Sequence, residues 1–591
     1  MEREPIARSN PAEAQTMPDD ERASEAEHLL PWWLLTLGFA VVLFLFSIGI
    51  SEVPLFEPDE GRYAEIPREM IATGDGLTPR LNGVLYFDKP PLYYWLTAAS
   101  IRVFGLNEFS VRFWSVLFAL VGIALAFLLG RTLAGVRFGA LAALLLGTSP
   151  LYLAMGHIST IDMTVSILLS VCITCFWYAS RSPPGGWRLA LWLGMFLASG
   201  LAVLAKGLIG IAIPGGVVLL FLMISREWTL LFTVPWIRGL LLFFITTVPW
   251  HVAMSLHHPS FAWFYFVHEH LLRYSTQVAY HAEPWWFFLP ILALGMLPWS
   301  GCLPPAVLLL RKGVSGGEER RLVQLCWCWV VWVLLFFSVS HSKLIPYVLP
   351  AFVPLAVLAV AGFRSLLEAR KPLARIMGRL GWGLAAITTM LLCAAVTWIG
   401  RGGRPDLLPP GTLAVWMPFA TGVAALVALC ATIFDPRRAP RRVLVCSFLA
   451  TACLSATVTL AAPAFGDQTS TRGVARYLAP RLTKDVSVVS FGFYPRSLSA
   501  YLGRLIDVVY HRGELAFGID HLSPAERQER FPYPDEFRSR WESDEPIFLV
   551  VRKRSLGAFT AISPPPHAVA FEAGEFLVLA NRTLQARESH P

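Results

Sequence analysis

The chain has 591 residues, of which 55% are apolar and only 15% are charged. A soluble domain carries about 25% charged residues, so this composition excludes a soluble globular enzyme. The net charge of +8 does not point to nucleic acid, because most arginines and lysines stand in short loops between apolar stretches. We therefore expect an integral membrane protein without a nucleic-acid partner.

Residues 1–29 are polar and acidic, which predicts a disordered cytoplasmic tail. Beyond them, apolar stretches of about 18 to 24 residues recur, each long enough to cross a hydrocarbon core of about 30 Å as a helix. The first stretch, Trp32 to Ile50, has no small-residue cleavage site after it and is predicted to stay as an anchor. We expect about 13 transmembrane helices, near residues 31–51, 109–130, 137–156, 160–180, 188–205, 208–225, 236–256, 286–310, 322–340, 344–363, 379–400, 412–434 and 442–463.

An odd number of spans puts the two termini on opposite sides of the membrane. Basic residues are concentrated in alternate loops, for example Arg131, Arg181 and Arg226, which all share the side of the N-terminus if the count is correct. By the positive-inside rule the N-terminus is cytoplasmic and everything after residue 464 is external. The expected fold is an all-α polytopic membrane bundle over residues 30–464.

The last segment, residues 465–591, has a different pattern. Short β-rich runs are separated by polar, helix-compatible stretches such as Pro524 to Ser543. The runs are Val486 to Phe493, Leu505 to Tyr510, Ile547 to Val551 and Ala568 to Leu579. This alternation predicts a small α/β domain outside the membrane.

All nine cysteines fall inside apolar segments, so no disulfide framework can be read from the sequence. Cys172 and Cys175 have the spacing of a redox or metal motif, but their apolar surroundings favour simple helix packing.

The first external loop, residues 52–108, is unusually rich in charges beside aromatic residues. Its stretch Arg62 to Thr73 places Tyr63, Ile66 and Met70 on one helical face and charged residues on the other. That pattern predicts a helix lying in the membrane interface, and Leu92 to Phe104 predicts a second one.

Asp59 and Lys89 in this loop each allow two interpretations. Asp59 follows Pro58, so it is either a helix N-cap or a carboxylate that acts as a base or orients a donor. Lys89 stands between Asp88 and two prolines; it is either a snorkelling lysine or a fixed ammonium that holds a lipid phosphate.

A second external loop, residues 257–285, contains His268, Glu269, His270 and Arg273 between aromatic runs. These residues are either scattered polar groups of a wet loop, or a metal-binding or proton-handling histidine with an arginine suited to phosphate. Zinc normally takes three or four protein ligands, so the two histidines alone are weak evidence for it.

Four more candidates stand at helix ends on the same external side: Asp162, Lys206, Lys343 and Tyr347. Charged groups there are either interface anchors or functional residues. A transporter would place such groups near the middle of the bilayer and reach both faces. Their collection on one side favours chemistry on a lipid-borne substrate.

These motifs resemble the family C (GT-C) integral membrane glycosyltransferases, most closely the 4-amino-4-deoxy-L-arabinose lipid A transferases, which are related to protein O-mannosyltransferases. The resemblance covers the whole membrane region. It rests on Pro58-Asp59-Glu60-x-Arg62-Tyr63-Ala64-Glu65, Phe87-Asp88-Lys89-Pro90-Pro91, the turn at Asp162, Gly200 to Gly207, His268-Glu269-His270-x-x-Arg273 and Ser342-Lys343-Leu344-x-Pro346.

The resemblance implies transfer of a sugar from an undecaprenyl-phosphate donor to lipid A, or a related envelope acceptor, at the periplasmic face of the bacterial inner membrane. It implies that Asp59 is essential, that Asp162 assists, and that Lys89 and Arg273 hold the carrier phosphate.

Further roles complete this set. We count Glu60 among the catalytic candidates, and Lys206, Lys343 and Tyr347 among the phosphate-binding ones. The position of Asp88 is usually Glu in the family, and together with the residue matching His268 it can bind zinc; the shorter Asp puts a metal here in doubt. A single displacement would invert the anomeric centre.

Three other functions stay open at this point. The chain could be another polyprenyl-phosphate-sugar transferase that acts on protein hydroxyls or a different envelope glycan. It could be a lipid or solute transporter, or a scaffold without catalytic activity whose external domain binds envelope proteins.

Overall fold

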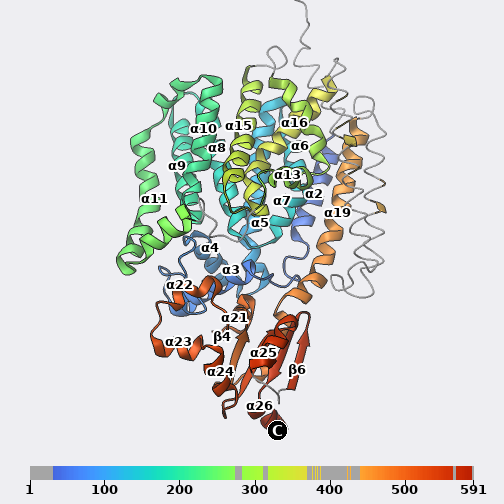
Figure 1. Cartoon of the computed structure of the whole chain (residues 1–591). Coiled ribbons are helices and arrows are strands. Elements are labelled where there is room, and N and C mark those ends of the chain that lie inside the picture. The colour runs from blue at the N-terminus through green and yellow to red at the C-terminus, as the bar shows by residue number, and fades with distance from the viewer. Residues whose placement is uncertain are drawn as a thin grey trace, which may run out of the picture.

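The computed structural model describes residues 31–272, 283–310, 317–368, 440–562 and 568–588, with isolated residues between 369 and 439. A bundle of long helices forms one end of the molecule, and a smaller domain forms the other, with helices α3 and α4 between them (Figure 1). The predicted tail 1–29 and Arg273 lie outside the described residues, as do almost all of the predicted spans 379–400 and 412–434.

The bundle contains helices from most of the predicted apolar stretches. They are α2 (Trp32–Ser47), α5 (Glu108–Ala134), α6 (Val136–Gly147), α7 (Pro150–His157), α8 (Ile161–Arg181), α9 (Gly186–Lys206), α10 (Ile209–Ser225), α11 (Trp236–His257), α13 (Phe288–Gly295), α14 (Leu303–Ala306), α15 (Gly317–Val339), α16 (Phe352–Glu368) and α19 (Pro440–Thr469). Shorter helical turns are η1 (Trp228–Thr233), η2 (Trp263–Leu272), η3 (Trp299–Cys302), η4 (Val307–Leu310) and η5 (Ile345–Ala351).

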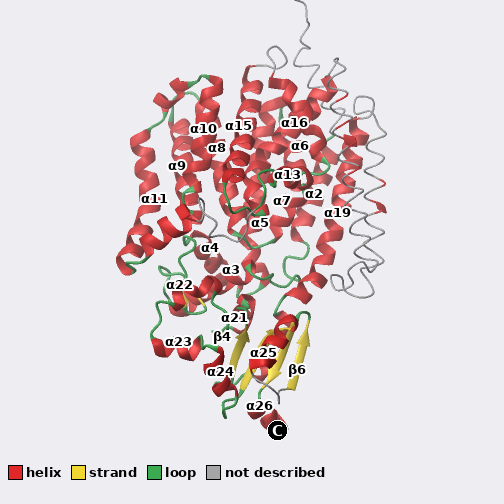
Figure 2. Cartoon of the chain, viewed as in Figure 1, coloured by secondary structure: helices red, strands yellow, loops and turns green. Residues whose placement is uncertain are grey.

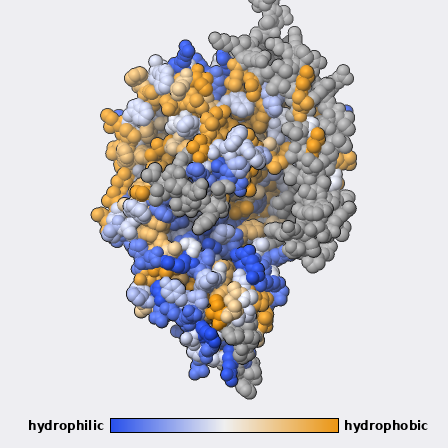
Figure 3. Space-filling view, viewed as in Figure 1, coloured by the Kyte–Doolittle hydropathy of each residue, from blue (hydrophilic) through white to orange (hydrophobic). Residues whose placement is uncertain are grey.

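The predicted count of 13 spans is not confirmed. Within the described residues, six helices are long and apolar enough to cross a membrane, or eight if each of two bent helix pairs is one span. The first pair, α6 and α7, bends by 65°. Ser149 precedes Pro150 there and is extended, as proline requires of its neighbour. The chain is therefore a multi-pass membrane protein, and Figure 3 shows its apolar surface concentrated over the bundle.

Helices of the bundle differ in what surrounds them. Of the most apolar 18-residue stretch of α8, 78% is buried inside the protein. The corresponding share for α11 is only 22%. Ile237, Phe244 and Ile245 are exposed on α11, which lies at the edge of the bundle in Figure 1. With hydrocarbon as its solvent, α11 needs no protein cover, so its apolar side chains face lipid.

The first external loop forms α3 (Asp59–Thr73), a hairpin of β1 (Arg80–Leu81) and β2 (Val84–Leu85), and α4 (Leu92–Phe104). Both predicted helices are confirmed. Their position in the membrane interface stays a prediction, and Glu65 and Glu69 on the charged face of α3 are buried. The smaller domain covers that face so closely that a Cβ on Gly61 would lie 2.5 Å from the backbone nitrogen of Ser497.

The smaller domain is built on one five-stranded sheet, seen as the yellow arrows in Figure 2. Its strands are β3 (Ser487–Phe491), β4 (Asp507–Val509), β5 (Ile547–Arg552), β6 (Ala568–Ala573) and β7 (Phe576–Ala580), in the order β4-β3-β5-β7-β6. Strand β3 runs parallel to β4 and β5, and β7 runs antiparallel to β5 and β6. All four predicted β-rich runs are confirmed, the last as a hairpin that turns at Gly574 with φ +54°.

Short helices surround this sheet. They are α20 (Arg472–Leu478), η8 (Ala479–Arg481), α21 (Arg496–Leu502), η9 (Gly513–Leu515), α22 (Ala516–Ile519), α23 (Pro524–Arg530), α24 (Pro534–Trp541), η10 (Lys553–Ser555), α25 (Leu556–Ile562) and α26 (Arg582–Glu588). The predicted domain limit at residue 464 falls inside α19, which continues from the bundle to Thr469.

The first loop and the smaller domain share one hydrophobic core. Tyr63 and Ile66 of α3 pack in the same buried cluster as Val488 of β3 and Phe548 of β5. Asn82 adds a two-way hydrogen bond to Ile506, donating from Nδ2 to the carbonyl at 2.8 Å and accepting from the amide at 3.1 Å. The smaller domain therefore fixes the loop that carries most candidate site residues.

Candidate active site

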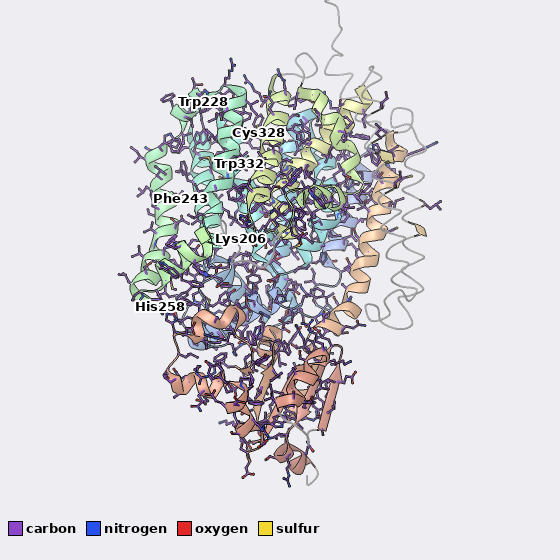
Figure 4. All side chains as sticks on the ribbon, in the orientation of Figure 1. Lys206, Trp228, Phe243, His258, Cys328 and Trp332 are labelled. Atoms are coloured by element: carbon purple, nitrogen blue, oxygen red, sulfur yellow. The ribbon has the colours of Figure 1, made fainter. Side chains whose placement is uncertain are left out.

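The candidate residues gather at the end of the bundle that faces α3 and α4. Figure 4 labels Lys206 at that end and Trp228, in the connection between α10 and α11, at the opposite end. The following contacts build the site from three groups of side chains.

The first group joins three helical segments. Lys206 is the last residue of α9, which stops at Gly207 in a left-handed conformation with φ +92°. Its ammonium pairs with the carboxylate of Asp162, in the first turn of α8. The same nitrogen lies 4.4 Å from the ring centroid of Tyr347 in η5, within range of a cation–π contact. Three predicted residues, far apart in the sequence, therefore meet.

The second group is centred on Arg62 of α3. Its Nη1 donates to Asp59 Oδ1 at 3.1 Å, and its Nη2 lies 2.7 Å from Glu514 Oε2 of the smaller domain. Helix α3 begins at Asp59 with Pro58 in the N-cap position, so the described contacts of Asp59 are those of an ion pair rather than a cap. The Asp59 side chain is 51% exposed, which leaves it accessible to a substrate.

Glu514 is held from two sides, since Arg496 also pairs with it. Burial alone would raise the pKa of Glu514, but the guanidinium groups of Arg62 and Arg496 hold it below its ordinary value. Glu514 is therefore a charged anchor that positions Arg62.

The third group surrounds Lys89. Its Nζ donates to the backbone oxygen of Asp88 at 2.8 Å and lies 3.6 Å from Glu269 Oε2. His268 Nδ1 lies 3.3 Å from the other oxygen of Glu269, and its ring stacks on Phe264 at 5.0 Å. Lys89 is thus held by a backbone carbonyl and a carboxylate, and its contact with a carrier phosphate stays a prediction.

The pKa of Asp88 is raised to about 6, first by burial and then by the negative charge of Glu269, against the opposing effect of Lys89. The charge of Asp88 therefore changes near pH 6.

Two buried tyrosines lie on α3 and α4. The ring centroids of Tyr63 in α3 and Tyr94 in α4 are 6.1 Å apart. Burial raises the pKa of Tyr63 well above its usual range; Tyr94, Asp59 and Asp162 add to the rise, and Arg62 opposes it. Burial also raises the pKa of Tyr94, and the charge of Asp88 adds to the rise.

Glu60 does not fit its predicted catalytic role. Its side chain is 0% exposed and is paired with Arg112. Both carboxylate oxygens accept hydrogen bonds from the protein itself. Glu60 is thus a structural partner inside the protein and not a group that contacts substrate.

Lys343 is also buried, and its Nζ donates to the carbonyl oxygen of Ser340 at 2.6 Å. Its predicted phosphate contact and that of Arg273 stay predictions, since Arg273 lies outside the described residues. Cys172 and Cys175 are free thiols on α8, in agreement with the predicted helix packing.

Asp88 and His268 were the predicted zinc ligands. Zinc needs three or four protein ligands in most sites. Across the described segments, no group of three His, Cys, Asp or Glu residues lies close enough to hold a metal ion. Glu269, the neighbour of His268, pairs with the ammonium of Lys89. Asp88 and His268 therefore stay predicted zinc ligands.

Two site residues were missed in the sequence. Glu514 pairs with Arg62, and Phe517 places its ring 4.1 Å from Phe264 and 5.2 Å from Phe87. Both come from the smaller domain, more than 400 positions along the chain from Arg62 and Phe87. Neither belongs to a motif, so only the fold could reveal them.

Two family models match parts of this chain. A family model described as dolichyl-phosphate-mannose-protein mannosyltransferase matches residues 88–252. A second, described as aminoarabinose transferase C-terminal domain, matches residues 474–581. The first match includes Asp88, Lys89, Asp162 and Lys206, and the second includes Glu514 and Phe517.

Two curated relatives are named undecaprenyl phosphate-α-4-amino-4-deoxy-L-arabinose arabinosyl transferase. The protein from Sodalis glossinidius, whose name ends in the number 1, is 35% identical over 386 residues. These residues span 64% of this chain and 66% of that protein. The protein from Pseudomonas aeruginosa is 31% identical over 536 residues, 89% of this chain and 93% of that protein.

A solved structure is similar over nearly its full length. It is the crystal structure of ArnT from Cupriavidus metallidurans bound to undecaprenyl phosphate, with a TM-score of 0.77 and 28% identity; the match covers 92% of this chain and 97% of that one. The helical bundle, the first loop and the smaller domain thus occur together in a known protein. The chain belongs to the undecaprenyl phosphate-α-4-amino-4-deoxy-L-arabinose arabinosyl transferase family.

Proposed function

We propose that this protein transfers 4-amino-4-deoxy-L-arabinose from undecaprenyl phosphate to lipid A at the periplasmic face of the bacterial inner membrane. The observation that carries the proposal is that three ion pairs, Asp59–Arg62, Asp162–Lys206 and Lys89–Glu269, lie at the end of the bundle that faces α3 and α4. The names of the relatives and the lipid bound to the similar structure support the donor.

The lysines supply positive charge for the leaving phosphate. Breaking the bond between the anomeric carbon and the carrier phosphate builds negative charge on that phosphate. Lys89 and Lys206 are each held by a carboxylate partner, so they are in position before the reaction begins. Such fixed cations stabilise the transition state more than the ground state. Arg273 and Lys343 are proposed to add to this charge.

Asp59 is proposed to orient the donor sugar, with Asp162 assisting. A phosphate of lipid A is already anionic and can attack without losing a proton, so Asp59 then needs only to bind the amino group of the sugar. With a hydroxyl acceptor, Asp59 would act as general base. A single displacement inverts the anomeric centre.

The topology is part of the proposal. We propose 13 spans, with a cytoplasmic tail (1–29), a membrane domain (30–464) and a periplasmic domain (465–591) whose first residues complete α19. The N-terminus is then cytoplasmic. Cysteine labelling from the outside tests this: Tyr533→Cys, which is 58% exposed, reacts in intact spheroplasts, and Trp228→Cys at the opposite end of the bundle does not.

Mass spectrometry of lipid A, incubated with the purified full chain and the aminoarabinose donor, tests the reaction. The wild type is expected to add the mass of one aminoarabinose, and Asp59→Asn to lose at least about 1,000-fold in rate. Asp467→Asn is the matched control, because Asp467 is 59% exposed and also pairs with one arginine. Equal rates for wild type and Asp59→Asn would refute the proposal.

A second acceptor class is favoured by the match of residues 88–252 to a protein mannosyltransferase model. Peptides bearing serine or threonine in the same assay distinguish the two. Sugar on the peptide and none on lipid A would assign the chain to protein glycosylation.

A further inference from the structure

Glu60 and Arg112 lie inside the junction between the first loop and the bundle. We infer that this pair is a positioning device that fixes the segment carrying Asp59 relative to the turn carrying Asp162. The inference rests on the proposed function, since it assigns the two aspartates to one reaction.

Arg112, in the first part of α5, is 1% exposed, and its guanidinium is fully engaged. A guanidinium has five N–H groups. Nε donates to Glu60 Oε1 at 2.8 Å, and Nη2 donates to Glu60 Oε2 at 2.6 Å and to Pro54 O at 3.0 Å. Nη1 donates to the carbonyl oxygens of Ile50 at 2.9 Å and Val53 at 2.6 Å. Arg112 thus holds the backbone of residues 50–54, the segment that leads to α3.

The carboxylate of Glu60 holds two further segments. Its Oε1 also accepts from the backbone N–H of Ser159 at 2.7 Å, and its Oε2 accepts from that of Phe56 at 3.0 Å. Phe56 lies in the turn that leads to Asp59, and Ser159 lies in the turn that leads to Asp162. One carboxylate therefore receives four hydrogen bonds and links the two aspartate-bearing turns.

Burial makes this link stiff. A buried backbone N–H that loses its acceptor costs free energy, so both turns are held to the same pair of oxygen atoms. Apolar residues of equal volume could fill the space of a buried ion pair without loss of stability. They could not accept from two backbone amides, so the geometry explains why a charged pair occupies this place.

A second, weaker contact holds the same turn. Tyr93 Oη lies 2.8 Å from Ser159 Oγ and 3.1 Å from Ser115 Oγ. Tyr93→Phe removes this contact and leaves the Glu60 carboxylate intact, so it offers a graded comparison.

The test compares Glu60→Gln with wild type. Glutamine keeps one of the two oxygens and replaces the other with an NH2 group that donates, so either the amide of Phe56 or the amide of Ser159 loses its acceptor. We expect kcat for lipid A to fall about 100-fold, the size of effect that a misplacement of about 1 Å produces. The rate is expressed per enzyme molecule that binds undecaprenyl phosphate, counted by titration, so that loss of folded protein does not contribute. The Kd for undecaprenyl phosphate is expected to stay within about threefold.

Glu319→Gln is the control variant. Glu319 pairs with Arg364 at 2.9 Å, at the end of the bundle where α5 stops, and both side chains are largely buried. A merely structural role lowers the number of binding-competent molecules and leaves kcat per competent molecule unchanged, which is the result expected for this control. The same result for Glu60→Gln would overturn the inference.

Hydrogen exchange supplies a readout that does not depend on sugar transfer. At least one of the amides of Phe56 and Ser159 is expected to exchange at least tenfold faster in Glu60→Gln than in wild type or Glu319→Gln. Unchanged exchange at both amides would overturn the inference even if transfer were lost. Absence of transfer by the wild type would instead refute the proposed function.

Should Glu60→Gln fail to fold, Glu60→Asp and Tyr93→Phe carry the same test. The expected fall in kcat is about tenfold for Glu60→Asp and about threefold for Tyr93→Phe. Unchanged kcat in both variants would overturn the inference.

Discussion

The two ends of the helical bundle carry charge in different ways. At the end near Trp228, Glu227 pairs with Arg181 at 3.2 Å and with Arg321 at 2.8 Å, in a region with more basic than acidic residues. At the other end, acids and bases occur together, partly buried and surrounded by phenols, and they come from the first loop, α8, α9, η2 and the smaller domain. The first pattern is what membrane topology requires, while the second is what a reaction on a charged lipid requires.

The comparison also shows what holds each end in place. Near Trp228, the described ion pairs join helices that are adjacent in the bundle. At the site, Arg62 joins Asp59 to Glu514, and Phe517 fills the space between Phe87 and Phe264. The part of the site that the bundle and the first loop form is thus completed by the smaller domain.

The strongest test of this difference between the two ends removes one positive charge from each end. Lys89→Ala or Lys206→Ala is expected to lower kcat about 100- to 1,000-fold, because the leaving phosphate loses a fixed cation. Arg321→Ala, at the opposite end and 51% exposed, is expected to change kcat less than about twofold. Transfer rates at saturating donor measure both. Similar losses of kcat at the two ends would show that the lysines of the proposed site contribute no more to sugar transfer than a cation at the opposite end.

Removing the acidic partners gives a smaller difference. Asp162→Asn is expected to lower kcat/KM about 10- to 100-fold, because the ammonium of Lys206 keeps its charge but loses its partner. Glu227→Gln removes the shared partner of Arg181 and Arg321 and is expected to leave kcat/KM within about threefold. A full kinetic titration of the donor distinguishes the two variants, and an unaffected Asp162→Asn would contradict the assignment of Asp162.

Phe517→Ala tests the contribution of the smaller domain. The half-buried ring packs on Phe264, next to His268, so its removal is expected to cost about 1–3 kcal/mol of stability and to weaken undecaprenyl phosphate binding about threefold to tenfold. Phe571→Ala is the control, since Phe571 packs on Tyr477 at 4.5 Å from the edge strand β6. Thermal unfolding and lipid titration measure the two effects. Equal lipid binding in both variants would show that Phe517 of the smaller domain does not contribute to the lipid-binding site.

The smallest expected effect concerns pH. The pKa of Glu69 is raised to about 8, mainly by burial and then by the charge of Glu65, against the pull of Arg68 and the N–H of Gly83. In the unfolded chain it titrates near 4.5, so the native state binds the extra proton between these values and stability falls as pH rises from about 5 to about 8. Tyr494 also faces this carboxyl pair.

Glu69→Gln is neutral at every pH and is expected to flatten this slope of Tm against pH. Glu572→Gln, at an exposed position, should keep the wild-type slope. If Tm still falls with rising pH in Glu69→Gln, a group other than Glu69 binds the proton that stabilises the native state.

Local patterns were sufficient for much of this molecule. Apolar stretches predicted the membrane class, because lipid forces the backbone into helices wherever a stretch is long enough. The repeat of Tyr63, Ile66 and Met70 predicted α3, and β-branched runs predicted the strands of the smaller domain, since both depend on neighbours in the sequence. The placement of Asp162, Lys206 and Tyr347 at one end followed from the order of the spans.

Tertiary structure alone decided how those elements meet. The bends in the two broken helix pairs, the burial of Glu65 and Glu69, and the pairing of Glu60 with Arg112 depend on what packs against each segment. Glu60 shows the reason best. Its position beside Asp59 indicated catalysis, but a side chain's role depends on the direction in which it points, and on a helix adjacent residues point about 100° apart. The Asp59 side chain is therefore 51% exposed, while Glu60 points into the interior, where it pairs with Arg112.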